Sequence, residues 1–348
     1  MVTNGARSET GANCLSTTKL KQVTSVDVAK AAGVSRAAVS RTFSNNGYVS
    51  EATREKVLAA AKALGYRVNH LARSLNRQRS DLIGLVVADM DNPFRSQQVN
   101  DLSEAILANN HRPLLIPTAQ GRDSSQVIDM LLHYNVSGVI VTSDTPPAAI
   151  FETCAENQVP VVLVNKQDKH PHVDRVLCDN AGGTRLLLKA FAEKCCKHIT
   201  VISSQAHSYS IRKREQLFCQ YAEQMGIRVD VIYAPSHCYQ GGLEAAENLS
   251  AFESQPDGVF CTNDYLALGL IDGLKDKTGK HIIDDMFVAG FDDMQQASWK
   301  SYQLTTIKQA TDEMATQSVE LLISRIQHPD QAARTCYLDV SLIRRQSL

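Results

Sequence analysis

A short stretch near the start of the chain carries the pattern that most narrows the possible folds. Small and apolar side chains recur there at helical spacing up to Gly33, a residue suited to the positive φ at a helix end. Ser35 can then cap a second helix, predicted for 36–43, which buries Val39 and Phe43 four residues apart. Two helices joined by so short a turn are typical of a helix-turn-helix, whose second helix enters the major groove of DNA.

The charge along the chain is uneven. Residues 1–80 hold 13 Lys and Arg against 4 Asp and Glu, whereas residues 81–348 hold 23 against 33. An excess of positive charge around a helix-turn-helix supplies the long-range attraction to phosphate that a nucleic-acid-binding module needs. The alternative, a basic face that is merely solvated, is less favoured once the helical pattern is considered.

After residue 80 the sequence alternates apolar strand runs with helical segments. The runs at 82–87, 138–141 and 159–164 indicate buried strands, and a second set of the same kind starts at 199–202. This βαβ rhythm predicts two doubly wound parallel sheets, and a length of 348 residues also favours more than one domain. Ligands of such sheets bind at the carboxyl ends of the strands.

Motifs for catalysis, metal binding and secretion are missing from the sequence. The stretch from Gly273 to Lys280 has His281 where a phosphate-binding loop needs Ser or Thr. No G-x-S-x-G, G-x-G-x-x-G or H-E-x-x-H pattern occurs, and the nine cysteines show no C-x-x-C spacing, so we expect no enzyme activity, metal or cofactor. The polar start lacks the apolar core of a secretion signal, and no apolar run suits a membrane span, so we expect a cytoplasmic protein.

An ordered series of motifs resembles the lactose/galactose repressor (LacI/GalR) family of bacterial transcription regulators. The series comprises DVAKAAGVSRAAVSR, NGYVSEATREKV, LARSL, LIGLVVADMDNPF, PDGVFCTND, VAGFDD, LTTIKQ and LIRRQSL, and it spans about residue 23 to the end. The resemblance implies an α-helical DNA-binding head followed by an α/β, two-lobed domain like the periplasmic binding proteins.

The resemblance and the strand rhythm together predict the domain organisation. The predicted parts are a disordered extension over 1–22, a helix-turn-helix domain over 23–68, a hinge helix and linker over 69–80, and an effector-binding and dimerisation domain over 81–348. Within the last part, one lobe is expected from 81–196 and 309–348 and the other from 197–308, with crossovers near 195–198 and 305–310.

The resemblance assigns DNA contacts to the head and the hinge. Arg41 can pair bidentately with a guanine edge, and Leu75 matches a leucine that wedges into the minor groove, with a core leucine as the alternative. Short polar side chains matched to phosphate contacts can also act as helix caps, and both roles are compatible. The predicted DNA-binding residues are Thr24, Ser35, Arg36, Ala37, Ser40, Arg41, Ser50, Thr53, Asn69, Ala72 and Leu75.

The resemblance also assigns an effector pocket between the lobes. Arg214 matches an arginine that reaches into this pocket, and Asp292 follows a predicted strand, although a surface cation and a loop cap are the plainer interpretations. A guanidinium fork beside carboxylates suits the hydroxyls of a sugar. His237 replaces the aromatic residue usual at a stacking position, for which nearby Tyr239 is an alternative. The predicted effector-binding residues are Phe94, Asp179, Ser208, Ser210, Arg214, His237, Asn263, Asp292 and Gln309.

These features predict a homodimeric repressor that binds near-palindromic operator DNA and responds to a small effector, with a sugar as the first choice. A nucleobase or a phosphorylated sugar is the alternative effector. A solute-binding protein would share the lobes but not the basic head, and a sugar-metabolising enzyme would need catalytic groups that the motifs do not supply. No heptad repeat follows the last motif, which favours a dimer over a tetramer.

Overall fold

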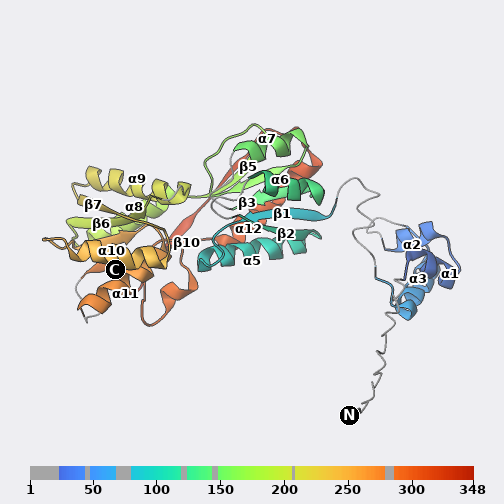
Figure 1. Cartoon of the computed structure of the whole chain (residues 1–348), viewed down its shortest axis with the longest axis horizontal. Helices are drawn as coiled ribbons and strands as arrows, with labels where there is room; N and C mark the ends of the chain where they lie inside the picture. Colours follow the sequence, from blue (N-terminus) through green and yellow to red (C-terminus); the bar gives the residue numbers. More distant parts are fainter. Residues whose placement is uncertain are drawn as a thin grey trace, which may run out of the picture. The chain divides into compact units, whose positions relative to one another are not determined.

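The chain divides into two compact units, residues 1–76 and 77–348 (Figure 1). The structure is a computed structural model, and it describes residues 23–43, 48–67, 80–118, 124–142, 148–205, 208–278 and 286–348. The predicted extension over 1–22 and the hinge over 69–79 lie outside these ranges, as do Asn69, Ala72 and Leu75. Their predicted roles therefore stay predictions.

Three helices form the described part of the first unit: α1 (Ser25–Ala32), α2 (Arg36–Thr42) and α3 (Glu51–Leu64). Thr24 and Asp27 form a capping box at the start of α1, which satisfies backbone N–H groups that the helix cannot. The second helix is one residue shorter than predicted. The helices enclose a small apolar core of Val28, Ala29, Val39, Val57 and Ala61.

The first lobe of the second unit contains a six-stranded parallel sheet with the order β11-β5-β4-β3-β1-β2. Its strands are β1 (Leu82–Val87), β2 (Arg112–Pro117), β3 (Gly138–Val141), β4 (Val161–Val164), β5 (Val173–Cys178) and β11 (Thr335–Leu338). Its helices are α5 (Pro93–Ala108), α6 (Ser124–His133), α7 (Ala148–Glu156) and α12 (Thr311–Gln327). One apolar cluster joins the sheet to α5 and α12, and another joins it to α6 and α7, so helices cover both faces (Figure 1).

The second lobe contains a four-stranded parallel sheet with the order β7-β6-β8-β9. Its strands are β6 (His198–Ser204), β7 (Arg228–Ala234), β8 (Gly258–Cys261) and β9 (Phe287–Ala289). Its helices are α8 (Asn180–Glu193), α9 (Tyr209–Gln224), α10 (Tyr239–Ser250), α11 (Asp264–Thr278) and the short 3₁₀ helix η2 (Gln295–Ser298). One core lies under α10 and α11, and the other lies under α8 and α9, which confirms the prediction of two doubly wound sheets.

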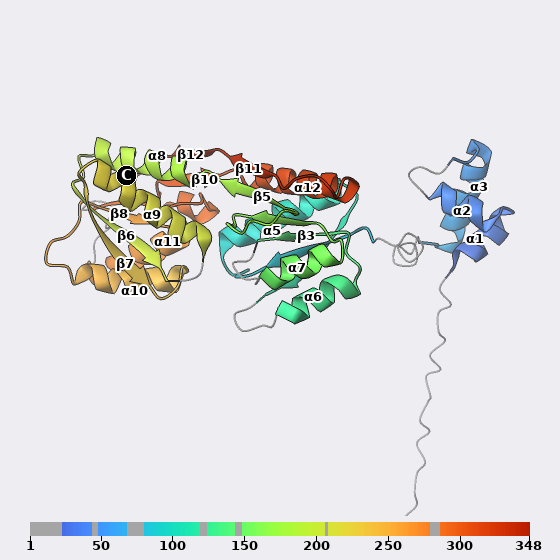
Figure 2. The same ribbon diagram turned by 90° about the horizontal axis from the view of Figure 1, so that it is seen from above.

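The predicted lobe boundaries differ from the structure at two places. Helix α8 packs through Leu187 and Phe191 against the second sheet, so the chain leaves the first lobe after β5, and not near 195–198. It crosses back at β10 (Thr306–Gln309), near the predicted 305–310. After β11 it crosses again, because β12 (Val340–Ile343) pairs antiparallel with β10 and the C-terminal Leu348 is buried in the second lobe (Figure 2). The alternation of strands and helices does not show which sheet a helix covers. The position of α8 in the second lobe could therefore not be predicted from it.

None of the helices in the described ranges combines the length and apolar character that crossing a membrane requires.

Candidate functional site

The second helix of the head presents a continuous exposed face. Val39 and Thr42 point into the core, while the other side of α2 is open to solvent. All four groove-facing residues predicted on this helix belong to the exposed side: Arg36, Ala37, Ser40 and Arg41. The helix therefore offers the kind of surface that enters a major groove.

The predicted phosphate contacts in the head occupy helix starts. Thr24 and Ser35 accept hydrogen bonds from backbone N–H groups of α1 and α2, at 3.4 and 3.2 Å. Ser50 precedes α3 without capping it, and its hydroxyl lies 2.9 Å from that of Thr53. Thr24 and Ser35 therefore cap helices, whereas Ser50 and Thr53 do not. Contact with phosphate remains a prediction for all four residues.

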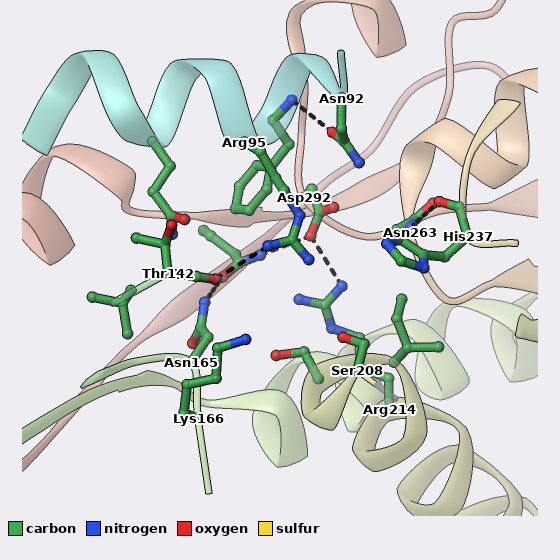
Figure 3. A pocket seen from close by; sticks show the side chains of 16 residues that line it. Asn92, Arg95, Thr142, Asn165, Lys166, Ser208, Arg214, His237, Asn263 and Asp292 are labelled. Carbon is green, nitrogen blue, oxygen red and sulfur yellow. Dashed lines mark hydrogen bonds and ion pairs between the residues drawn. The ribbon is translucent and has the colours of Figure 1, made fainter. Parts of the chain in front are cut away.

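A pocket lies between the two lobes, at the carboxyl ends of strands from both sheets (Figure 3). The space between its lining atoms is about 500 Å³, and this figure includes open solvent at the mouth. The pocket is lined by Asn92, Phe94, Arg95, Gln98, Thr142, Val164, Asn165, Lys166, Ser208, Ser210, Ile211, Arg214, His237, Asn263, Asp292 and Gln309. Eight of the nine predicted effector residues are among them.

Arg214, on the buried side of α9, is held in one position by the second lobe. Its Nε donates to Asn180 Oδ1 at 2.9 Å, and its Nη1 donates to the carbonyl of Thr262 at 2.9 Å and to Asp292 Oδ1 at 3.0 Å. The guanidinium also lies 3.7 Å from the ring centroid of Phe291. Arg214 also forms a side-chain hydrogen bond with the thiol of Cys178, and it lines the pocket (Figure 3). Because Arg214 is buried, the alternative interpretation as a surface cation is excluded.

Asp292 has an unusual backbone conformation in the segment that follows β9, after Gly290 and Phe291. Its φ of 126° is rare for a residue with a side chain, and a backbone bond from its N–H to the carbonyl of Ile307 at 2.7 Å supports it. Burial raises the pKa of its carboxyl, and Arg214 offsets part of that effect. Oδ1 accepts from Arg214 and from Gln309 Nε2 at 2.7 Å, which leaves Oδ2 without a partner among the described residues.

Several predicted residues combine a pocket position with a structural role. Asn263 Oδ1 accepts from the N–H of Leu266 at the start of α11, and its Nδ2 donates to the carbonyl of His237 at 2.9 Å. The Nδ1 of His237 is buried without a partner among the residues described. Phe94 extends from α5 to pack against the apolar core of the second lobe.

Two serines in the pocket make no side-chain hydrogen bond to the residues that the structure describes. Ser208 is at the N-cap position of α9 but makes no side-chain cap bond, and Ser210 lies in the first turn of the same helix. Both hydroxyls can therefore bond a ligand.

Asp179 is the one predicted effector residue that the structure does not bring to the pocket. Its carboxylate turns back to cap α8, where Oδ1 accepts from the N–H of Gly182 at 2.9 Å. An acidic residue that follows a strand can either bind a ligand or cap the next helix, and Asp179 caps α8.

The sequence interpretation missed most of the first lobe's contribution. Asn92 caps α5 shortly after β1, and Asn165 and Lys166 directly follow β4. Arg95, on the first turn of α5, donates to the carbonyl of Thr142 at 3.1 Å. The rule that ligands bind at strand ends could have found these residues, because each follows an apolar strand run.

Comparison with known proteins agrees with this architecture. Residues 24–69 match the family described as bacterial regulatory proteins, lacI family, and residues 188–348 match the periplasmic binding protein-like domain. The HTH-type transcriptional repressor PurR of Mannheimia succiniciproducens is 28% identical over 326 residues, covering 92% of this chain and 97% of the relative. Over most of its length the chain is therefore similar to repressors of the LacI family of bacterial regulatory proteins.

Solved structures of LacI-family proteins extend the match to nearly the whole chain. The lac repressor dimer bound to operator and the anti-inducer ONPF has a TM-score of 0.83 and 26% identity, covering 94% of this chain and 99% of that one. A complex of the transcriptional regulator CelR with cellobiose has a TM-score of 0.71 and 26% identity, with 94% and 100% covered. The LacI-family prediction is confirmed. PurR and the lac repressor are transcriptional repressors, not enzymes.

Proposed function

We propose that this protein is a homodimeric repressor whose affinity for a near-palindromic operator is set by a small hydroxylated molecule, in the first place a sugar, bound between the lobes. The observation that carries the proposal is the pair formed by Arg214 and Asp292. Each is buried, is fixed by neighbours and lines the pocket, and Oδ2 of Asp292 has no hydrogen-bond partner among the described residues. A donor beside an acceptor suits neighbouring hydroxyl groups, which both donate and accept.

The remaining lining supports a polar ligand of small size. Ser208 and Ser210 add hydroxyls, and His237 and Phe94 add flat faces on which a sugar ring can stack. The transcriptional regulator CelR, which has a similar fold, is seen in complex with cellobiose, and this supports a sugar as the ligand.

A ligand in this pocket would affect how the two lobes are arranged relative to each other. Asn165 of the first lobe donates to Gln309 Oε1 at 3.2 Å, and Gln309 donates to Asp292 of the second. A molecule that contacts both sides binds one lobe arrangement better than another, so it shifts the population of the form that binds operator. We expect induction, which means that the ligand weakens operator binding.

The DNA side of the proposal rests on the exposed face of α2 and on the relatives. The lac repressor structure contains a dimer bound to operator, and two copies of this chain would place two heads on the halves of one palindrome. Such a repressor acts at the chromosome, and we therefore place it in the cytoplasm.

A gel shift on the DNA upstream of the chain's own gene tests this function. The parent protein should bind this duplex better than a scrambled one, and a neutral sugar or one of its acidic derivatives should release it. Asp292→Asn and Arg214→Ala should keep operator binding and lose the response, whereas Arg212→Ala, on the exposed side of the same helix, should retain it. Equal binding to both duplexes, or a normal response in both pocket variants, would contradict the proposal.

A further inference from the structure

We infer that Arg345 is a positioning residue for the effector site: it holds the turn that carries Asp292. This inference rests on the proposed function, in which the carboxylate of Asp292 binds the effector. Arg345 follows β12, which ends at Ile343, and it does not line the pocket. Any effect of Arg345 on the ligand is therefore exerted through other residues.

The turn at Asp292 needs support from its surroundings. Asp292 and Asp293 have φ angles of 126° and 54°, so two consecutive residues with side chains adopt conformations that favour glycine. Such a backbone persists only where the contacts around it hold it in place. The side chain of Asp292 is short, so a change in the turn would redirect the carboxylate that accepts from Arg214 (Figure 3).

Arg345 bonds to the turn at Asp293. Its Nη2 donates to Asp293 Oδ1 at 2.6 Å, and its Nη1 donates to the carbonyl of Leu304 at 2.7 Å. The two side chains of this ion pair are only 15% and 14% exposed, so water and salt screen it weakly. Charge-assisted hydrogen bonds of this kind are stronger than neutral ones. One guanidinium therefore connects the turn to the segment just before β10.

The backbone around Arg345 is itself held on two sides. The N–H of Arg345 donates to Thr305 Oγ1 at 2.9 Å, and Ser347 Oγ accepts from the N–H of Thr305 at 2.7 Å. Ser347 Oγ also donates to the carbonyl of Val288 in β9 at 2.6 Å, and the N–H of Val288 donates to the carbonyl of Ser347 at 2.8 Å. Residues 345–347 thus join the segments before and after the turn.

Hydrogen exchange with mass spectrometry on the full-length protein tests whether Arg345 holds the turn. Peptide 290–296 contains the N–H groups of Asp292 and Met294, which are bonded at 2.7 and 3.0 Å. In Arg345→Met, which loses both donors, we expect this peptide to exchange about tenfold faster.

Two control variants separate this effect from a general loss of charge or stability. Arg344→Met removes the neighbouring arginine, which is half exposed and pairs with Glu193, and it should leave the turn unchanged. Val201→Ala lowers stability from the buried core of the same lobe without touching the turn. Exchange in peptide 290–296 that rises as much in Val201→Ala as in Arg345→Met would make the role of Arg345 merely structural and overturn the inference.

Two further variants examine the ion pair itself. Arg345→Lys keeps a charged donor for Asp293 and should restore most of the protection, whereas Asp293→Asn weakens the same bond and should loosen the turn. The effects of the two ends should not add, so Asp293→Asn should change exchange little once Arg345→Met is present. Effects on the rate that multiply would contradict a shared bond.

The consequence for the effector site is measured by release of operator in the gel shift, with ribose and then cellobiose as probes. Arg345→Met should need about tenfold more sugar for half release, while operator affinity without sugar stays at the parental value. A parental response in Arg345→Met would overturn the inference and leave the proposed function standing. If neither sugar releases the parent protein, the proposed function fails for these sugars, and the exchange data alone decide the inference.

Discussion

At the scale of single residues, the buried carboxyl group of Asp264 supports the pocket although it does not line it. Asp264 lies behind Asp292, where burial, and then the charge of Asp292, raise its pKa to about 8. It accepts from the hydroxyl of Thr306 at 2.6 Å and the N–H of Met294 at 3.0 Å. A side chain at Gly290 would meet its Oδ1 at 2.1 Å, so the glycine is needed for this close approach. Asp264 therefore remains protonated at neutral pH. Its hydrogen bonds stabilise the segment after β9, which contains Asp292.

Replacement of this carboxyl should flatten the pH dependence of stability. The unfolded chain loses the Asp264 proton near pH 3.8, whereas the folded protein holds it until about pH 8, so stability falls as pH rises between these values and levels off above them. Asp264→Asn keeps an acceptor and a donor for its two partners and has no proton to lose. We expect its thermal midpoint to fall less than the parent's from pH 5 to pH 8 in scanning fluorimetry.

Asp168→Asn, which removes an exposed carboxyl, should follow the parent curve. Parallel curves for Asp264→Asn and the parent would show that Asp264 is ionised in the folded protein.

At the scale of elements, short-range chemistry explains where the helices of the head start. Thr24 and Ser35 supply cap oxygens, and Gly33 ends α1 with a φ of 64°. These caps leave α2 with one side packed on the core and the other exposed, so Arg41 is directed away from the apolar cluster. The orientation of α2 is thus a consequence of packing Val39.

Arg41 is expected to form hydrogen bonds with the edge of a base in the operator. Arg41→Ala is expected to lose about 1–3 kcal/mol of discrimination between the operator and altered duplexes, because a bidentate pair with guanine is lost. Affinity for non-specific DNA should change less. Fluorescence anisotropy titrations on operator and scrambled duplexes measure both, and equal losses on the two would reassign Arg41 to a phosphate contact.

At the scale of the whole molecule, the two parts of the chain differ in net charge. The basic residues of the first part and the acidic excess of the rest mean that a near-neutral chain still attracts DNA through one end. The acidic excess of the second part disfavours DNA contact there.

Operator binding should therefore weaken steeply with salt. If each dimer neutralises 6–10 phosphates, affinity should fall by about 10³ to 10⁵ between 50 and 200 mM salt, as counterions are released from the DNA. Filter binding across this range gives the slope of log affinity against log salt. A slope near zero would mean that phosphate contacts contribute little and that the basic first part has another role.

Local sequence patterns were enough to identify the helix-turn-helix and the two sheets, and the family resemblance assigned the eight predicted residues that line the pocket. Caps, strand runs and strand ends depend on neighbours a few residues away, so they can be recognised in one dimension. Tertiary structure alone decided three matters: the lobe to which α8 belongs, the turn of Asp179 towards its own helix, and the convergence of Arg95 and Lys166 with Arg214. Each depends on which distant surface a side chain meets on folding, and local sequence periodicity carries no record of that partner.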